Sequence, residues 1–592
     1  MVKTNETCDV LIIGAGMAGA CLARQLTLEV PDLKIIMVER KEEFDWWVGE
    51  SSIEAFDDYA IRNLRLGPYL MSHHIIKHGL RFFFDSEDRN LRMSELSEHG
   101  RTRYTGLNRG VQIDRSRFDR DLCALNRENG VEVLMGTRVP SGEGQIVIDS
   151  DGEHLVKTTN GTIGCRYLVD AAGRTSPLVR HLNLALEEDT ERPDTGSYWI
   201  RVADCNYIDD LGDDAWRRRV DSTLRWSSTN HFMYHGYWIW LIPLDDRVVS
   251  IGVTFDRQIA PMRIKDGSEF VEFLRGHRAM DELLGDRFEV LDFMGFRTLA
   301  RGAKQYFSMD RWYLTGMSGI FIDPLFSGNS GIIAVNNRLI VSLIEADRAG
   351  ETQVVENRIR HFNIHMRNIF KRVAASLSTY RHFGSYDAFV AWQTLRYHTI
   401  LNYEVPMQHA DHAPLIAGYD SHCGNDCDCA VGNWSTSQSL GEAGDRLTRE
   451  FVEFLDDRGA YYGRNAGYFH DKTEREEIRS STMLPMLQAR QEKISRTDYE
   501  AFFRYLIGRM CQIDGMPLYE KAFVETFSGD WRDGQRLKEV YDAQIEAHEA
   551  GAEPGSNSIC WDIKGPVESD PAEILEWRHR FVGPDGDPVA RP

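Results

Sequence analysis

Three glycines near the N-terminus have the spacing of a phosphate-binding turn. Gly14, Gly16 and Gly19 follow the apolar run CDVLII and open a stretch with helical periodicity, in the pattern G-x-G-x-x-G. The first glycine permits a tight turn, the second lets a pyrophosphate approach the backbone, and the third lets helix and strand pack closely. N–H groups at the start of the helix, in the stretch that includes Ala15 and Ala18, then face the phosphates. The spacing predicts a dinucleotide site.

A carboxylate lies at the end of the next apolar run. KIIMVERK contains Glu39 where a carboxylate can accept hydrogen bonds from a ribose. The alternative for Glu39 is a solvated charge at a strand end. Residues 8–41 therefore predict a β-α-β unit, and the glycine triplet alone leaves NAD and FAD open.

The elements that would position this site recur along the chain. Two later segments, RYLVDAAGRTSP and WYLTGMSGIFIDPLFSGNSGIIAVNNRLIVSLI, again run from strand through glycine turn to helix. β-rich stretches between them predict an inserted sheet subdomain around 185–300. We expect an α/β protein (an α+β composite) with a discontinuous Rossmann-type core over 1–385. A mainly helical region over 386–592 would follow, because aromatic residues recur there at three- and four-residue steps.

Charge and hydropathy exclude several functional classes. The 592 residues carry a net charge of -22, which repels nucleic acid and anionic membrane surfaces. No stretch approaches the roughly 18 uninterrupted apolar residues that a membrane span needs. The first apolar run is broken by the glycine turn and does not read as a signal segment. We expect a cytoplasmic protein without a nucleic-acid or membrane partner.

One cluster of thiols has the residue types of a metal site. His422, Cys423, Cys427 and Cys429 lie within eight residues. Their spacing matches neither the paired C-x2-C of structural zinc nor a usual iron–sulfur run. We expect free loop thiols here and no metal.

The run YWIWLIP sets two tryptophans two residues apart. Alternation with period two puts three side chains on one strand face, Trp238, Trp240 and Ile242. Ile239 and Leu241 would face the other way. Pro243 should end the strand, because it has no N–H to give to the ladder. Periodicity alone predicts a core strand buried on both faces.

The order of three further segments resembles flavin monooxygenases. They are QIDRSRFDRDL at 112–122, VDAAGRTS at 169–176 and FIDPLFSGNSGI at 321–332. In that superfamily the positions matching Arg115, the Asp323-Pro324 turn and Ile332 help hold the cofactor, which favours FAD. The family usually has Gly-Asp-Ala shortly before this turn, with its Asp on the ribityl chain. This chain has Met317 at that position, so the resemblance implies that the contact is lost or replaced.

Within that superfamily, W-x-W-x-I-P at 238–243 resembles the signature of flavin-dependent halogenases. VGESS at 48–52, IKHGLRFFF at 76–84 and DPLFSGNSG at 323–331 agree with it, so the resemblance covers most of residues 8 to 345. It implies that Glu50 and Ser51 lie against the flavin and that Lys77 is catalytic. Ser330 and Gly331 would lie beside the halide, although this chain has two extra residues after Ser327 in that motif.

The resemblance also implies a reaction. A separate reductase would supply FADH2, and reduced flavin with O2 would oxidise chloride or bromide to hypohalous acid. Lys77, as a desolvated amine that changes protonation readily, would present the halogen to an electron-rich carbon. A tunnel wall would keep the organic substrate away from the flavin, formed by Trp238, Trp240, Pro243 and Phe326. Such enzymes serve secondary metabolism, including antibiotic biosynthesis.

Phe326 narrows the substrate class. Tryptophan halogenases have glutamate at this position, whereas phenylalanine resembles halogenases of phenols and pyrroles, often on carrier-tethered substrates. We therefore expect a small aromatic substrate, free or tethered to a carrier protein. Two alternatives stay open: a hydroxylase or dehydrogenase of the same superfamily, and a flavin-binding interaction protein without catalysis.

Overall fold

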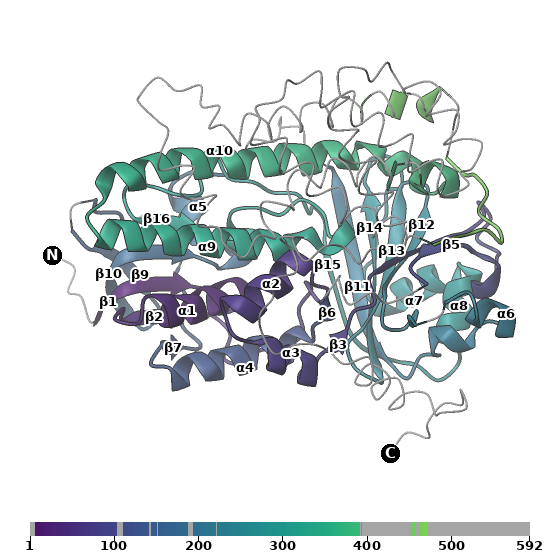
Figure 1. Cartoon of the computed structure of the whole chain (residues 1–592), viewed down its shortest axis with the longest axis horizontal. Coiled ribbons are helices and arrows are strands. Elements are labelled where there is room, and N and C mark those ends of the chain that lie inside the picture. The colour runs from purple at the N-terminus through teal and green to yellow at the C-terminus, as the bar shows by residue number, and fades with distance from the viewer. Residues whose placement is uncertain are drawn as a thin grey trace, which may run out of the picture.

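The computed structural model describes residues 6–102, 110–390, 392–393 and 449–471, apart from 141, 143, 151, 187–192, 221, 450–451, 454, 458 and 460. The region predicted to be helical, 386–592, therefore lies mostly outside the described residues. So do His422, Cys423, Cys427 and Cys429. The described residues form a mixed α/β fold built on two large β-sheets (Figure 1).

The first sheet gathers strands from distant parts of the chain. Its order is β7 (Glu132–Leu134), β2 (Ile35–Val38), β1 (Glu6–Ile13), β10 (Gly161–Asp170), β9 (His154–Thr158) and β8 (Ile146–Val147), with β16 (Trp312–Leu314) beside β10. β1 runs parallel to β2 and β10, and β10 runs parallel to β16. β1, β10 and β16 are the strands of the three returns that the sequence predicts. Their carboxyl ends meet at one edge, which is where open parallel sheets bind ligands.

Helices pack around this sheet because their apolar stripes need cover. They are α1 (Met17–Glu29), α2 (Glu54–Arg62), α3 (Gly67–His73), α4 (Arg115–Glu128), α5 (Pro177–His181), α9 (Gly328–Arg348) and α10 (Thr352–Ser376). α1 contacts both α4 and α9, and α2 also packs on α9. In Figure 1, α9 and α10 run side by side along the length of the molecule, and α10 reaches toward the second sheet.

The second sheet has eight strands and is mostly antiparallel. Its order is β15 (Glu289–Phe296), β11 (Thr195–Ala203), β14 (Val248–Asp256), β13 (Tyr237–Pro243), β12 (Thr229–Tyr234), β4 (Leu80–Phe84), β5 (Ser97–Gly100) and β17 (Phe469–Asp471). The segment expected to be inserted, 185–300, supplies β11 to β15. The sheet extends beyond that segment because the aromatic run of β4 pairs with β12, with Phe83 stacked on Phe232 at 5.0 Å.

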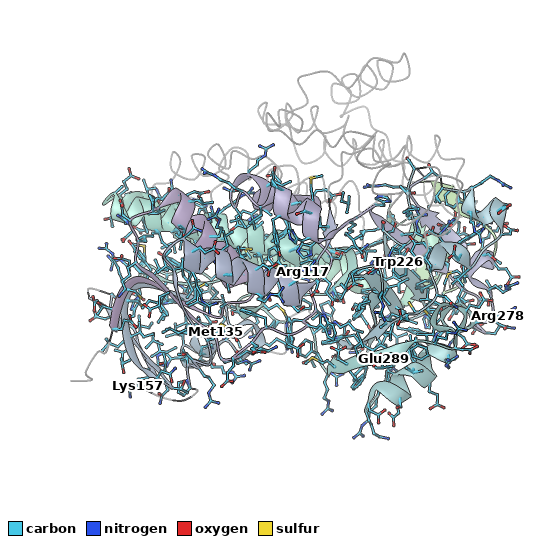
Figure 2. All side chains as sticks on the ribbon, turned by 90° about the horizontal axis from the view of Figure 1, so that it is seen from below. Arg117, Met135, Lys157, Trp226, Arg278 and Glu289 are labelled. Atoms are coloured by element: carbon cyan, nitrogen blue, oxygen red, sulfur yellow. The ribbon has the colours of Figure 1, made fainter. Side chains whose placement is uncertain are left out.

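Shorter elements complete the described fold. They are α6 (Asp214–Arg217), α7 (Gly267–Arg275) and α8 (Arg278–Leu284), the pair β3 (Ile75–Ile76) and β6 (Val111–Gln112), and short 3-10 turns that include η4 (Gly316–Ser318), η5 (Leu325–Ser327) and η6 (Leu377–His382). Side chains fill both halves in Figure 2, where Met135 and Lys157 lie in one half and Glu289 and Arg278 in the other. Among the helices of the described ranges, none is long and apolar enough to cross a bilayer.

The tryptophan strand β13 lies in the middle of the second sheet, paired with β12 and β14. Trp238, Trp240 and Ile242 pack into the core shared with the first sheet. Ile239 and Leu241 pack into a second core, which also contains side chains of α7 and α8. The predicted alternation and the strand end at Pro243 are confirmed.

Candidate active site

The glycine turn connects β1 to α1 and has the geometry of a phosphate cradle. Gly14 has φ +104°, and a Cβ there would lie 2.5 Å from the Ala171 carbonyl oxygen. A Cβ on Gly19 would lie 2.0 Å from the Gly14 oxygen. A Cβ on Gly16 would meet nothing closer than 3.7 Å. Gly14 and Gly19 are therefore required for the backbone to fold in this way, whereas Gly16 leaves room for a ligand to approach the backbone.

This difference predicts two distinct mutant phenotypes. Gly16→Ala should fold with nearly unchanged stability but bind FAD about tenfold more weakly, roughly 1.4 kcal/mol, because the methyl group would occupy the pyrophosphate approach. Gly14→Ala should instead lower the free energy of unfolding by at least about 1–2 kcal/mol, because φ is positive and the Ala171 carbonyl is in the way. FAD titration by calorimetry and urea unfolding measure the two effects. Wild-type FAD affinity in Gly16→Ala would contradict the cradle.

Glu39 follows β2 by one residue and faces the glycine turn. Its carboxylate accepts hydrogen bonds from the Ala15 and Lys41 backbone N–H groups, each at 3.0 Å. Gly14 and Glu39 line a hollow together with Arg40, Thr175 and Arg180, among others. The Ala18 carbonyl accepts a hydrogen bond from Asn337 of α9 at 3.1 Å, so α9 is fastened to the turn. This hollow suits the adenosine end of a dinucleotide.

A second hollow is lined by residues of α1 and α9 and by residues of β11 and β13 in the second sheet. Its lining includes Met17, Glu50, Ser51, Arg115, Ser197, Trp199, Thr229, His231, Trp238, Trp240, Ile242, Phe296, Met317, Phe321, Pro324, Ser327, Asn329, Ser330 and Ile333. We call it the central cavity. Mostly apolar walls with a few polar groups suit the ring system of a flavin. Because Gly14 lines the first hollow and Met17, which follows the glycine turn, lines the second, the residues present fit an extended FAD.

Arg115 holds the loop 48–52 against the central cavity. Its guanidinium pairs with Asp119 at 2.8 and 3.1 Å and donates to the Val48 carbonyl at 2.9 Å. Gly49 has φ +96°, and a Cβ there would lie 2.8 Å from Arg115 Nη1. Arg115 therefore acts on the loop through the backbone, and it also lines the cavity where the family resemblance expects a flavin contact.

Glu50 of this loop is held by a charge that the sequence motif does not contain. Arg201 of β11 donates to Glu50 Oε1 at 2.7 and 3.0 Å and pairs with Asp292 at 2.7 Å. Glu50 and Arg201 are 2% and 0% exposed. Burial raises the pKa of Glu50, and Arg201 and Ser250 oppose that rise. Arg201 could not be found from the sequence, because it lies 151 positions from Glu50 and carries no motif.

Lys77 points inward, between β3 and β4. It is 4% exposed, and its Nζ donates to Ser51 Oγ at 2.8 Å and to the Ser52 carbonyl at 2.7 Å. Ser51 Oγ is in turn 2.7 Å from Thr229 Oγ1, and both hydroxyl residues line the central cavity. Lys77 itself does not line the cavity. One hydroxyl therefore separates its amine from the cavity wall.

Burial also tunes the charge of Lys77. Desolvation lowers the pKa of Lys77 to about 8, the nearby Glu54 and Asp57 oppose this shift, and Arg101 adds to it. Asp57 is 2% exposed, and its Oδ2 has no hydrogen-bond partner among the described residues. An amine with a pKa near 8 can hold or release a proton near neutral pH, as acid–base chemistry requires.

Trp238 is connected to the Asp323-Pro324 turn through a tyrosine. Its indole N–H donates to the Tyr380 hydroxyl, which donates to Asp323 Oδ2 at 3.2 Å. The Leu325 N–H donates to Asp323 Oδ1 at 2.9 Å. Tyr380 belongs to η6, after α10, and has no counterpart in the sequence motifs. One hydrogen-bond network thus joins Trp238 to the Asp323-Pro324 turn, and both Trp238 and Pro324 line the central cavity.

Asp323 should make stability depend on pH. Burial raises its pKa to about 7, whereas an unfolded chain gives up this proton near pH 3.9. Between these values the folded state holds the proton and the unfolded state does not, so stability falls as pH rises. We expect a loss of about 2–3 kcal/mol between pH 5 and pH 8 that Asp323→Asn abolishes.

Urea unfolding of the protein without added flavin, at both pH values, measures this loss. The control is Asp245→Asn, which removes an exposed carboxylate and should keep the wild-type pH dependence. An unchanged pH dependence in Asp323→Asn would contradict the assignment.

The residues expected to hold halide form the first turn of α9. Ser327, with φ +58°, precedes Gly328, so the two extra residues are absorbed by the helix. Ser330 lines the cavity, but its hydroxyl donates to the Ser327 carbonyl at 3.1 Å and accepts from the Ile53 N–H at 3.3 Å. The helix turns Gly331 toward Ile53 instead.

The helical period decides which residues of α9 reach the cavity. Positions i and i+3 share a face, so Ser330 and Ile333 line the cavity while Ile332 does not. Pro243 likewise lies outside the lining, where Ile242 takes the expected place. Met317 lines the cavity at the position where the family has Asp. The side chain of Phe326 lies outside the described residues.

The chain is similar in sequence and in fold to proteins of known function. A family model described as an FAD binding domain matches residues 7–240. The chain is 27% identical over 386 residues to the flavin-dependent halogenase chlA of Dictyostelium discoideum, covering 60% of this chain and 63% of the relative. It is 25% identical over 382 residues to tetracycline 7-halogenase of Kitasatospora aureofaciens, covering 58% and 65%. The chain thus spans less than two thirds of the length of either relative.

A crystal structure of the halogenase PltM in complex with phloroglucinol and FAD has a similar fold. The TM-score is 0.58 at 19% identity, covering 87% of this chain and 98% of that chain. Residues 7–240 thus match an FAD-binding domain, and more than half of the chain is similar to curated flavin-dependent halogenases.

Proposed function

We propose that the protein is an FADH2- and O2-dependent halogenase that installs chloride or bromide on an electron-rich aromatic compound. The observation that carries this proposal is the placement of Lys77. Its amine is buried, has a pKa lowered to about 8 and is separated from the central cavity by the Ser51 hydroxyl. Family members are expected to relay oxidised halogen to a lysine of this kind.

The glycine turn would hold the pyrophosphate of FAD and Glu39 its adenosine end, and the central cavity would hold its flavin ring system. The bound reduced flavin would, with O2, supply oxidising power that converts halide to hypohalous acid. Trp238 and Trp240 would exclude the organic substrate and bulk water from that part of the cavity. Because the sequence contains one dinucleotide turn of this spacing, we infer that a separate reductase supplies FADH2.

Lys77 would activate the halogen by moving one proton. Its ammonium group hydrogen-bonds the oxygen of hypohalous acid and gives up a proton as the oxygen–halogen bond breaks, so that water leaves. The halogen forms a bond to the ring carbon of the substrate. The neutral amine of Lys77 then accepts the proton that this carbon loses, which restores the ammonium group.

The proposed substrate is a phenol, pyrrole or similar ring, free or tethered to a carrier protein. Its support is Phe326, the residue at the position where tryptophan halogenases have glutamate. A phenol carries its own activating oxygen and needs less help in losing the ring proton.

The test is a product analysis. The purified protein is given FADH2 from a flavin reductase, O2, bromide and a panel of phenols, pyrroles and indoles, and the products are identified by mass spectrometry. We expect brominated phenols or pyrroles, recognised by the paired bromine isotopes. Oxygenated products would favour a hydroxylase. If no product forms, and if reduced flavin is not oxidised in a substrate-dependent way with any halide, the result would favour a flavin-binding protein without catalysis.

A further inference from the structure

A basic hollow lies at the back of the second sheet, away from the central cavity. It has a volume of about 550 Å³, which falls within the range of small-molecule sites. Four cationic side chains line it: Arg257, Arg263, Lys265 and Arg297. Such a cluster is unusual in a chain with a net charge of -22. We call it the basic hollow.

Two of these four cations form ion pairs with acidic residues. Arg257 pairs with Asp194 at 2.7 Å, and Lys265 pairs with Glu269 at 2.7 Å. Arg263 and Arg297 are exposed, and neither has an ion-pair partner among the residues that the structure describes. No acidic side chain is among the described residues that line the basic hollow, so these two guanidinium groups add positive charge to it. Guanidinium groups bind carboxylate and phosphate with two parallel hydrogen bonds.

The floor of the basic hollow is aromatic. Tyr198 and Phe255 line it, and their rings are stacked at 5.7 Å with an interplanar angle of 12°. Tyr198 is also stacked on Phe293 at 6.1 Å, so three strands contribute parallel rings. Tyr198 is partly exposed, whereas Phe255 is buried beside it on the neighbouring strand. The exposed edge of Tyr198 can therefore contact a flat ring while an attached anion meets the arginines.

We propose that the basic hollow is a second ligand site, for a small aromatic anion whose carboxylate or phosphate is held by Arg263 and Arg297 and whose ring lies against Tyr198. The site is distinct from the proposed active site. It is nevertheless built on the same strands, because Ser197 and Phe296, the neighbours of Tyr198 and Arg297, line the central cavity from the opposite face of the sheet.

The test measures binding to the full-length protein by calorimetry, without FAD and without turnover. The probes are phenyl phosphate, benzoate and inorganic phosphate. We expect phenyl phosphate or benzoate to bind several-fold more tightly than inorganic phosphate, because only the first two carry a ring. Stronger binding of phenyl phosphate would identify a phosphate ligand, and stronger binding of benzoate a carboxylate ligand.

Variants test whether the probes bind in the basic hollow. Arg263→Gln with Arg297→Gln should weaken the tighter probe at least tenfold, whereas Arg218→Gln, an exposed arginine on another element, should leave it unchanged. Tyr198→Leu should remove the advantage of the aromatic probes over inorganic phosphate. Binding that survives the double arginine substitution, or no binding of any probe, would overturn the proposal. Because the readout is binding alone, this failure is distinguishable from failure of the halogenase assignment.

Discussion

Lys77→Met abolishes halogenation, by at least about a thousandfold, while oxidation of the reduced flavin by O2 continues: this is the first result that we expect. Removing the amine removes both the donor that activates hypohalous acid and the acceptor of the ring proton, and each such role contributes about 10²–10⁴ in rate. Methionine keeps an unbranched side chain of similar length in the buried site. The folding of this variant should therefore be preserved, since the hydrogen bonds of Lys77 go to one hydroxyl and one carbonyl, neither of which is charged.

Three measurements separate an effect on chemistry from an effect on folding. Oxygen uptake and hypohalous acid trapped by an added scavenger should remain near wild-type levels, and FAD affinity should be unchanged. Lys34→Met, which removes an exposed lysine, is the matched control and should halogenate normally. If Lys77→Met still halogenates, the lysine has no part in the mechanism. If oxygen uptake disappears as well, the lysine acts on the flavin step instead.

The parts of the site that the sequence predicts are those fixed by local geometry. The glycine turn follows from backbone conformation, because Gly14 needs a positive φ and Gly19 has no room for a side chain. The faces of β13 follow from the period of a strand, so Trp238 and Trp240 lie where alternation puts them. These features depend on neighbours in the chain and can be read without a structure.

The parts that the sequence does not predict depend on distant partners. Tyr380 reaches Trp238 and Asp323 from beyond α10, with no motif of its own. β4 joins the second sheet from a position more than a hundred residues before β11. The segment DPLFSGNSG contains the serine and glycine that the halogenase motif requires. Which of them faces the central cavity depends on the residue at which α9 begins, because that start turns Ser330 inward and Gly331 toward Ile53.

Arg201→Met should be among the most destabilising single substitutions in the chain, lowering the free energy of unfolding by about 3–5 kcal/mol. The reason is that it leaves Glu50 buried without its counter-charge, since Arg201 makes two hydrogen bonds to that carboxylate. Burial already raises the pKa of Glu50, so the variant should bind a proton there and lose further stability as pH rises. Urea unfolding at pH 6 and pH 8 measures both effects.

The same pair also explains how the loop at the central cavity keeps its shape. Adding Glu50→Gln to Arg201→Met removes the orphaned charge and should recover most of the lost stability, because the cost lies in the unpaired ion rather than in the missing bond. FAD affinity should be lowered in the single variant and should not recover in the double variant, since in both the loop 48–52 is no longer fastened to β11. The control is Arg247→Met, whose pair with Asp204 is 58% and 35% exposed and should therefore contribute little to stability. If Arg201→Met were no more destabilising than this surface control, Glu50 would have to be neutral in the native protein, and the loop would be held by packing alone.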